Sequence, residues 1–452
     1  MSLDPRTPVL VGVGQFTQRP EDPAEALEPV AMMEEAVSRA VDDSGAPSLG
    51  KRAGLIAAVK GAWRYPDPAA VVAERLGAAG ARTAMTTDGG NTPQSVVNAL
   101  AGRIAGGQLD VGIVVGAEGI WSRRRARTRG VDRELTEQPA ATAPDEVLGS
   151  DLQMSSEAER ARGLAMPVHF YPLFESAIGH ARGETVTEHV ERISRLWARF
   201  NAVAVDNPYA WTRTPMTAEQ IRTPTPDNRM VGFPYTKAMN SNWDLDQAAA
   251  LVLCSAEAAA DAGVPSDRWV FPLSGADAHD TYLVSHRDRL WESPAMRAAG
   301  RRALALAALG VDDLAHVDLY SCFPSAVQMA AAAIGLSEER GLTVTGGLTF
   351  AGGPLNNYVS HSIATMAGVL RSDPGSVGLV TANGGYVTKH AMGLYSTEPP
   401  AGGFRWEDAQ PEVDALPTRG TVDDHDGPVT IEAHTVMHER EGPQQGLLAL
   451  LL

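Results

Sequence analysis

Apolar and polar positions repeat along the chain in a way that indicates an internal duplication. The pattern predicts a helix that starts at Pro29 and runs through AMMEEAVSRAVDDS to Gly45, and a similar one from Pro294 through AMRAAGRRALALAAL to Gly310. Proline in the first turn and glycine after the last turn are the usual limits of a helix. The two helices are therefore expected to occupy equivalent places in two similar halves.

A second helix and the strand after it also recur at a constant offset. The strands VGIVVGA (111–117) and VGLVTAN (377–383) match, and a Gly-Gly pair precedes each helix, at 89–90 and 352–353. The matched helix positions are Val97, Leu100, Ala101, Gly102 and Ile104 in one copy and Ile363, Met366, Ala367, Gly368 and Leu370 in the other. We therefore predict two copies of one α/β unit.

The composition of these elements predicts how they are layered. The strands are almost continuous apolar runs, which is typical of strands that are covered on both faces. The matched helices carry Ala and Gly outside their apolar stripe, so both of their faces can approach neighbouring backbone closely. The sequence therefore favours an α/β fold with central helices between two sheets, and a single doubly wound sheet is the alternative.

A long insertion separates the two copies and suggests the division into domains. At roughly 125 residues it is too long for a plain connection, and it contains the helix pattern TVTEHVERISRLWARFNAVA (185–204). We expect a first half at 1–264 that includes a loop subdomain at about 119–245, and a second half at 265–397. The remaining residues, 398–452, are expected to form an additional C-terminal domain.

The tail of the chain is richer in Pro, Gly and acidic residues than the two halves. The segment VTIEAHTVMH (429–438) alternates with period two and predicts a strand. The sequence then ends in GLLALLL, an aliphatic run with no later segment to cover it. We therefore expect a partial, β-rich final domain.

Composition and charge exclude several classes of protein. The chain has 452 residues and a net charge of −17, which argues against a nucleic-acid binder because such proteins need a basic surface. With two cysteines, Cys254 and Cys322, it has neither a disulfide framework nor a cysteine-based zinc site. No apolar run reaches membrane-spanning length, and the N-terminus lacks a signal-peptide pattern. We expect a soluble cytoplasmic protein that binds no membrane.

The duplicated halves, the insertion and three local segments resemble the thiolase superfamily. The segments are DGGNTPQSVVNAL (88–100), YSCF (320–323) and VTANGGYVTKHAMG (380–393). The sequence is most similar to the sterol-carrier-protein thiolase branch and, within it, to the thiolase-like protein type 1 group. The resemblance implies a five-layered α-β-α-β-α fold and action on acyl-CoA thioesters, as in acetyl-CoA acetyltransferases, with acyl-CoA as the ligand and no permanently bound cofactor.

The resemblance places glycine and alanine where the family has its two catalytic cysteines. Gly89 stands at the position of the nucleophilic cysteine, which a helix start normally activates by favouring the thiolate. Ala382 stands at the position of the second cysteine. Ser95 is close to the first position, and the simplest interpretation of it is a serine at a helix start. Classical cysteine-dependent thiolase chemistry is therefore not expected.

Four further candidates fall on or near the family's active-site signatures. Tyr320 aligns with an oxyanion-hole residue and could donate a hydrogen bond, and Gly384 would keep backbone N–H groups close to a carbonyl oxygen. Cys322 is either a reactive thiol or a small core residue. His361, the counterpart of Ser95 in the second copy, points away from the apolar stripe and is either a base or a structural or surface histidine.

Basic residues of the insertion are candidates for binding the phosphates of CoA. Arg123 and Arg125 lie in the run SRRRARTR, whose alternative interpretation is a solvated charged turn. Arg229 and Lys237, in the irregular part of the insertion, are weaker candidates of the same kind. We predict no metal site, because the histidines of the tail lack further ligands.

Three hypotheses follow for the function. The first is an acyl-CoA-binding acyltransferase in which His361, Tyr320 and Gly384 surround the acyl carbonyl, with His361 as general base. The second is a non-catalytic acyl-CoA-binding or scaffold protein, and the third is a thioester hydrolase. The chain could form a homodimer, as family enzymes do, or remain monomeric.

Overall fold

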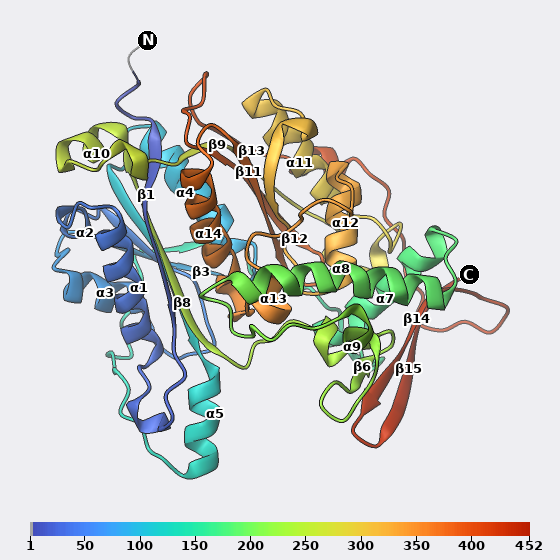
Figure 1. Ribbon diagram of the computed structural model, residues 1–452. Coiled ribbons are helices and arrows are strands. Elements are labelled where there is room, and N and C mark those ends of the chain that lie inside the picture. The colour runs from blue at the N-terminus through green and yellow to red at the C-terminus, as the bar shows by residue number, and fades with distance from the viewer. Residues whose placement is uncertain (1–2) are drawn as a thin grey trace.

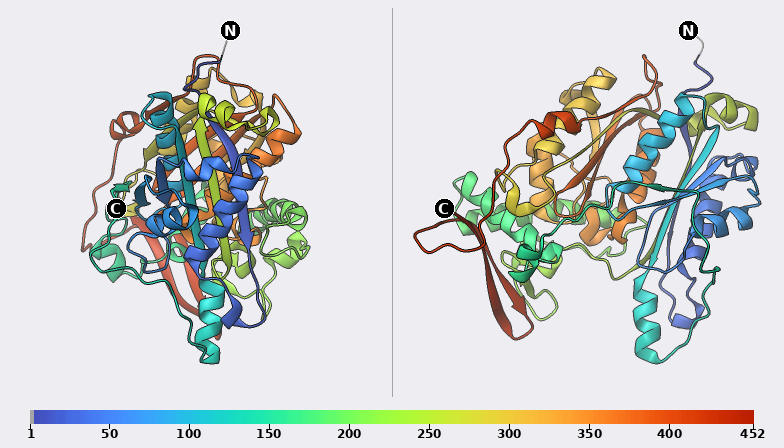
Figure 2. Two further views of the ribbon diagram at one scale, coloured as in Figure 1. Left: turned by 90° about the vertical axis from the view of Figure 1, so that its left-hand side faces the viewer. Right: turned by 180° about the vertical axis from the view of Figure 1, so that it is seen from behind.

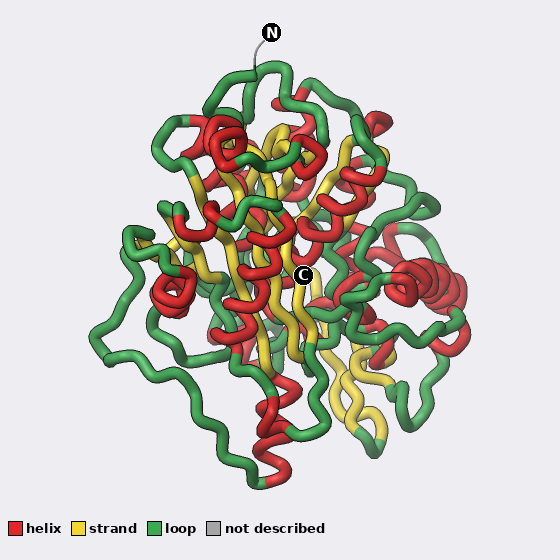
Figure 3. The backbone as a smooth tube through the Cα atoms, turned by 60° about the vertical axis from the view of Figure 1, so that its left-hand side comes forward, coloured by secondary structure: helices red, strands yellow, loops and turns green. Residues whose placement is uncertain are grey.

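The first half of the chain forms a mixed six-stranded sheet covered by helices on its outer face. The computed structural model describes residues 3–452. Figure 3 looks onto this face and shows helices in front of the strands. The strand order is β1 (Pro8–Thr17), β8 (Asp246–Ser255), β4 (Val111–Gly119), β2 (Leu55–Ala58), β3 (Arg82–Thr86) and β5 (Glu146–Leu148). The outer helices are α1 (Pro29–Asp43), α2 (Ser48–Lys51), α3 (Pro68–Leu76) and α10 (Ala256–Ala262).

The second half repeats this arrangement with a five-stranded sheet. Its strand order is β10 (Leu314–Asp318), β11 (Val377–Gly384), β12 (Lys389–Ser396), β9 (Phe271–His279) and β13 (Arg405–Asp408). Its outer helices are α11 (Pro294–Ala307), α12 (Pro324–Ile334) and α15 (Gln410–Asp414). In both halves the first strand pairs antiparallel with a strand that in turn pairs with the strand after the central helix. The predicted duplication is therefore present in the topology.

Helices α4 (Thr92–Ala105) and α14 (Tyr358–Ser372) form the middle layer between the two sheets. Figure 1 shows the order of layers as helices, sheet, central helices, sheet, helices. The predicted five-layered α-β-α-β-α fold is confirmed, and a single doubly wound sheet is excluded. The strands are buried along nearly their whole length, as their apolar runs predicted.

Glycines in the strands let the central helices approach both sheets closely. A Cβ on Gly116 of β4 would lie 2.5 Å from the amide of Asn357, just before α14, and a Cβ on Gly275 of β9 would clash with Asn98 of α4. The sequence pointed to small residues on the helices, whereas these close contacts rest on small residues of the strands. Polar helix side chains can therefore sit directly on sheet backbone.

The insertion packs beside the second half and supplies part of a third sheet. Its long helix α8 (Val186–Asp206) is the one predicted at 185–204. The run SRRRARTR belongs to the helix α5 (Ile120–Arg129) and not to a turn, and Ile120 and Ala126 of this helix are buried. The remaining elements are α5 (Ile120–Arg129), α6 (Glu157–Ala161), α7 (Pro167–Ala181), α9 (Ala218–Arg222), β6 (Met230–Gly232) and β7 (Tyr235–Thr236), and α13 (Gly347–Phe350) lies in the second half.

The tail does not form a sheet of its own. Strand β13 pairs with β9, whereas β14 (Thr430–Glu439) and β15 (Gly442–Leu451) form a hairpin that joins β6 through Met437 and Gly232. Figure 2 shows this hairpin at the end of the molecule away from the first sheet. Its aliphatic side chains Leu448 and Leu450 stay exposed, as the uncovered run GLLALLL predicted. No helix within residues 3–452 is long and apolar enough to cross a membrane.

Candidate active site

The start of α4 and the end of β11 meet at glycines. A Cβ on Gly384 would lie 3.0 Å from the Cα of Gly89 and 3.2 Å from the backbone nitrogen of Gly90. Gly89 has φ +150°, a conformation that strains any residue with a Cβ. The structure therefore brings together two of the positions that the family resemblance singled out, and it does so with backbone alone. We call Gly89, Gly90 and Gly384 the glycine junction.

Tyr320 closes one side of the glycine junction. Its hydroxyl lies against Gly90, where a Cβ would clash with it, and its ring packs edge-on against Tyr358 with centroids 5.5 Å apart. Burial raises the pKa of Tyr320 well above the usual value, with a smaller contribution from Cys322. The hydroxyl is therefore protonated at neutral pH and can donate a hydrogen bond, as its predicted role requires.

Lys389 lies on the other side of the junction, at the start of β12. Its Nζ would be 3.1 Å from a Cβ on Gly89, and it donates hydrogen bonds to the backbone oxygens of Asp88 and, at 3.1 Å, Ser150. The residue is 6% exposed, and burial lowers the pKa of its amine. Lys60 pairs with the Asp88 carboxylate at 2.8 Å, so two lysines meet at this residue.

Asn356, just before α14, connects the glycine junction to Lys60 and Asp88 through hydrogen bonds. Its Oδ1 accepts a hydrogen bond from the backbone N–H of Gly89 at 3.0 Å. Its Nδ2 donates to the backbone oxygen of Lys60 at 2.9 Å and to the Asp88 carboxylate at 3.2 Å. One side chain from the second half therefore fixes the loop before α4 of the first half.

Two amide side chains present unused oxygen atoms at the junction. Asn91 donates through Nδ2 to Ser95 at 3.3 Å, and Ser95 donates in turn to Asp277. Asn383, which is 2% exposed, donates through Nδ2 to the Tyr171 hydroxyl at 3.0 Å. Within residues 3–452 the buried Oδ1 atoms of Asn91 and Asn383 have no hydrogen-bond partner. Buried acceptors are costly without a donor, so these two favour a ligand that carries O–H or N–H groups.

Tyr171 of α7 holds the turn that follows β11. Its hydroxyl donates to the backbone oxygen of Gly385 at 3.0 Å and accepts from the backbone N–H of Val387 at 3.2 Å. The backbone oxygen of Tyr171 accepts from Ser325, which also binds Tyr235. The position of the turn therefore depends on how α7 packs against α12.

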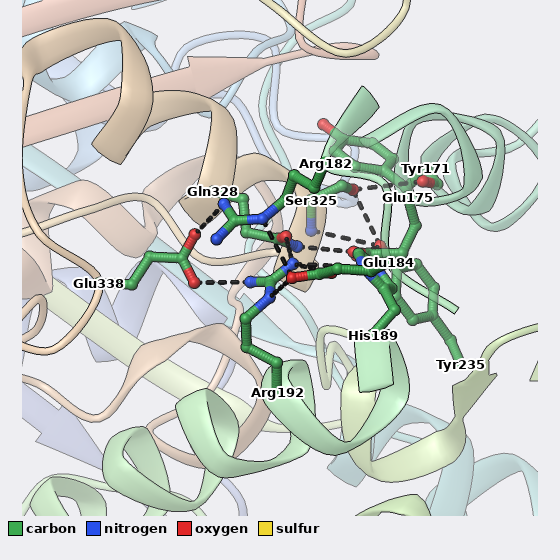
Figure 4. Close-up of polar contacts among 10 residues, drawn as sticks. All are labelled: Tyr171, Glu175, Arg182, Glu184, His189, Arg192, Tyr235, Ser325, Gln328 and Glu338. Atoms are coloured by element: carbon green, nitrogen blue, oxygen red, sulfur yellow. Dashed lines mark hydrogen bonds and ion pairs between the residues drawn. The ribbon is translucent and has the colours of Figure 1, made fainter. Parts of the chain in front are cut away.

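A buried charged network fixes α7 against α8 and α12 (Figure 4). At its centre Glu175, fully buried, accepts hydrogen bonds from His189 at 2.5 Å, from Gln328 at 2.6 Å and from the Tyr235 hydroxyl. Arg192 links this centre to two outer carboxylates. Since Tyr171 lies on the same helix as Glu175, the network also fixes the turn after β11, next to the glycine junction.

Two further residues predicted from the sequence, Cys322 and His361, are both buried. Cys322 is buried near Asn383, with Sγ 3.8 Å from its Nδ2, and burial raises the pKa of its thiol to about 12. His361 donates one hydrogen bond through Nδ1 to the Oε1 of Gln15 of β1 at 2.8 Å, and burial lowers the pKa of its ring to about 3. No hydrogen bond within residues 3–452 links His361 to the glycine junction, so this geometry does not support the predicted general base.

The four basic candidates for CoA binding are not brought together. Arg123 donates to the backbone oxygen of Ala62, and Arg125 donates to that of Pro20 at 2.7 Å. Arg229 precedes β6 and donates to the backbone oxygen of His438 at 3.2 Å, far from α5 in both Figures 1 and 2. Lys237, just after β7, is exposed. Among the described residues no group of His, Cys, Asp or Glu has the arrangement of a metal site.

Sequence reasoning missed Lys389, Asn356 and Asn91, because they come from three elements and form no local motif. Lys389 is the first residue of β12, KHAMGLYS, which is buried throughout. A charged residue at the start of a buried strand is the one signal that could have drawn attention to it.

Comparison with solved structures identifies the family. The monomeric SCP2-thiolase-like protein type 1 from Mycobacterium smegmatis is 32% identical over 99% of this chain and 92% of its own, with a TM-score of 0.83. The chain belongs to this family. The predicted membership of the thiolase superfamily and of its type 1 group is confirmed. No protein-family model and no curated protein matches the chain.

More distant thiolases share the fold of this family. The dimeric peroxisomal thiolase of Saccharomyces cerevisiae is 12% identical, with a TM-score of 0.60 over 88% of this chain and 99% of its own. The acetyl-CoA acetyltransferase of Syntrophomonas wolfei is 14% identical, with a TM-score of 0.61 over 87% of this chain and 99% of its own. The protein is thus thiolase-like in architecture.

Proposed function

We propose that the protein binds an acyl-CoA thioester with its acyl carbonyl at the glycine junction, and acts on it without a cysteine-bound intermediate. The convergence of Gly89, Gly90 and Gly384 is the observation that carries this proposal, because it leaves backbone where a side chain would otherwise fill the space. Membership of a thiolase-like family supports the class of ligand.

Tyr320 and Lys389 supply the electrostatic part of the chemistry. A protonated phenol and an ammonium group on opposite sides of a carbonyl stabilise the negative charge that develops on its oxygen. Removal of one such donor typically costs about 3 kcal/mol of transition-state stabilisation. This role replaces the one that the sequence suggested for His361.

No thiol takes part in this scheme. Cys254 and Cys322 are both buried, and burial raises the pKa of each to about 12. A thiolate is the nucleophilic form of cysteine, so neither side chain attacks a thioester at neutral pH. We place the CoA tail on the insertion, where Lys237 is exposed. Arg123, Arg125 and Arg229 instead stabilise the loops that they contact.

Isothermal calorimetry with acetyl-CoA and with free CoA tests the proposal. Gly384→Ala places a methyl group against Gly89 and Asn91, so we expect at least a tenfold loss of acetyl-CoA affinity at unchanged circular dichroism. Gly368→Ala in the exposed part of α14 meets no atom within 4 Å and serves as the matched control.

The products distinguish the proposed activity from its alternatives. Formation of acetoacetyl-CoA, or its cleavage with added CoA, supports an acyltransferase. Affinity without any product supports the binding or scaffold protein, and release of free CoA in the absence of an acceptor supports the hydrolase. The proposal is wrong if neither acetyl-CoA nor acetoacetyl-CoA binds.

A further inference from the structure

Lysine is rare in this chain, and its placement is therefore informative. Of the 38 basic Lys and Arg residues only four are lysines, at positions 51, 60, 237 and 389. Two of them, Lys60 and Lys389, meet at Asp88 beside the glycine junction. Arginine makes most of the ion pairs of the protein, whereas lysine is the basic residue whose pKa shifts readily on burial. A buried lysine at this place points to chemistry that only an amine performs.

The amine of Lys389 lies where a catalytic side chain at position 89 would begin. Its Nζ is 3.1 Å, and its Cε 3.0 Å, from the Cβ that Gly89 lacks. In the family resemblance this position holds the nucleophilic cysteine. Glycine at 89 therefore makes room for a group that reaches the same place from β12.

The surroundings of Lys389 lower the pKa of its amine, which raises the fraction of the neutral, nucleophilic form above that of an exposed lysine. Burial is the main cause that lowers its pKa, and the charge of Lys60 acts in the same direction, whereas Asp88 and Asp151 oppose it. Desolvation and a neighbouring cation are the two usual means by which proteins activate lysine. The backbone oxygens of Asp88 and Ser150 meanwhile hold the amine in place.

We propose that Lys389 forms a reversible imine with the ketone of a β-ketoacyl-CoA bound at the glycine junction. The nitrogen forms a bond to the ketone carbon, the carbon–oxygen double bond breaks, and the oxygen leaves as water with the two protons of the amine. Addition of water reverses the step and restores the lysine. The protonated imine withdraws electrons from the neighbouring carbon, which eases loss of a proton or a group from it.

The ketone is a better partner for Lys389 than the thioester. Attack on the thioester would expel CoA and leave an amide, which is stable and would end the reaction cycle. Attack on the ketone leaves an imine that water removes. The CoA part of this substrate rests on the proposed function, whereas the reactivity of the amine does not.

Reductive trapping tests the inference. The full-length protein is incubated with acetoacetyl-CoA and sodium cyanoborohydride, then digested and analysed by mass spectrometry. We expect one reduced adduct, on the peptide that contains Lys389. The adduct should be lost in Lys389→Arg, which keeps the charge, and retained in Lys51→Arg on the outer helix α2. Site mapping on the unchanged protein remains decisive if the Arg variant does not fold.

The outcomes separate this inference from the proposed function. Binding of acetoacetyl-CoA by calorimetry without an adduct on Lys389 overturns the imine and leaves the proposed function intact. An adduct spread equally over Lys51, or an amide that forms without the reductant, also overturns it. An adduct on Lys389 with 2,4-pentanedione but no binding of any CoA ester supports the reactive amine and refutes the acyl-CoA proposal.

Discussion

Replacement of His189 by alanine should destabilise the protein strongly, because it leaves a buried carboxylate without its cationic partner. His189 is 5% exposed and bridges Glu175 at 2.5 Å and Glu184 at 2.6 Å. Glu184 keeps Arg192 at 2.7 Å, whereas Glu175 retains only uncharged donors, Gln328 and Tyr235. The cost therefore falls mainly on Glu175.

The expected magnitude follows from the burial of Glu175. Removal of one partner of a buried ion pair costs about 3–5 kcal/mol, and the two remaining hydrogen bonds place this case near the lower limit, about 3 kcal/mol. Arg195→Ala on the same helix breaks an exposed pair with Glu191 at 3.7 Å and should cost about 0.3 kcal/mol. The contrast between the two variants isolates the effect of burial.

Urea unfolding followed by tryptophan fluorescence measures both costs, with equal slopes as the condition for comparing them. In a Glu175→Gln background the buried charge is absent, so His189→Ala should cost about 2 kcal/mol less than it does alone. A cost below about 1 kcal/mol, or no coupling between the two changes, would refute the assignment of a charged pair.

The direction in which pH changes the stability cost of His189→Ala follows from the pKa of His189. Burial opposes protonation of His189, but the hydrogen bonds to Glu175 and Glu184 outweigh it and raise its pKa above the usual value. A raised pKa contributes stability that is complete below the unfolded value of about 6.5 and is lost as the pH rises through the folded value. The difference in unfolding free energy between the unchanged protein and His189→Ala should therefore shrink on going from pH 6 to pH 9.

Three further variants test the remaining assignments. Asn357→Ala removes two buried hydrogen bonds and should cost about 2 kcal/mol in urea unfolding, whereas Asn91→Ala should lower acetyl-CoA affinity about tenfold at a smaller cost in stability. Burial lowers the pKa of His361 to about 3, so its neutral form contributes stability that is lost as the pH falls from about 6.5 toward 3. His361→Gln should therefore gain stability relative to the unchanged protein on acidification, with no loss of any catalytic activity.

The duplicated scaffold could be predicted from the sequence because local residue patterns determine its helices and strands. Proline marks the start of α1 and α11, and continuous apolar runs mark β4 and β11, whereas α11 ends at Ala307, before the predicted Gly310. The strand predicted at 429–438 is β14, at Thr430–Glu439. Such features depend on residues that are neighbours in the chain, so one sequence is enough to find them.

The active-site group could be predicted only in part, because its members meet through tertiary structure. Gly89, Tyr320 and Gly384 were found because family signatures cover them, and the structure places them together. Lys389 lies within the third of these segments but not at a position to which the resemblance gives a role, and Asn356 lies outside all three. For His361, helix periodicity showed that the side chain points away from the core stripe but not what lies opposite, which is Gln15.

Comparison of the two copies shows why the asparagine before the central helix makes different hydrogen bonds in each of them. Asn91 and Asn357 are separated by the same offset as the matched helices, and each lies just before its central helix. In the second copy Asn357 donates to the backbone oxygen of Gly116 at 2.7 Å and accepts from Ser360 at 2.7 Å. In the first copy the position of Ser360 is taken by Gln94, which donates to Asn98 instead, so the Oδ1 of Asn91 keeps no partner within residues 3–452. The same asparagine thus completes a packing contact in the second half, whereas in the first half its buried Oδ1 has no donor among residues 3–452.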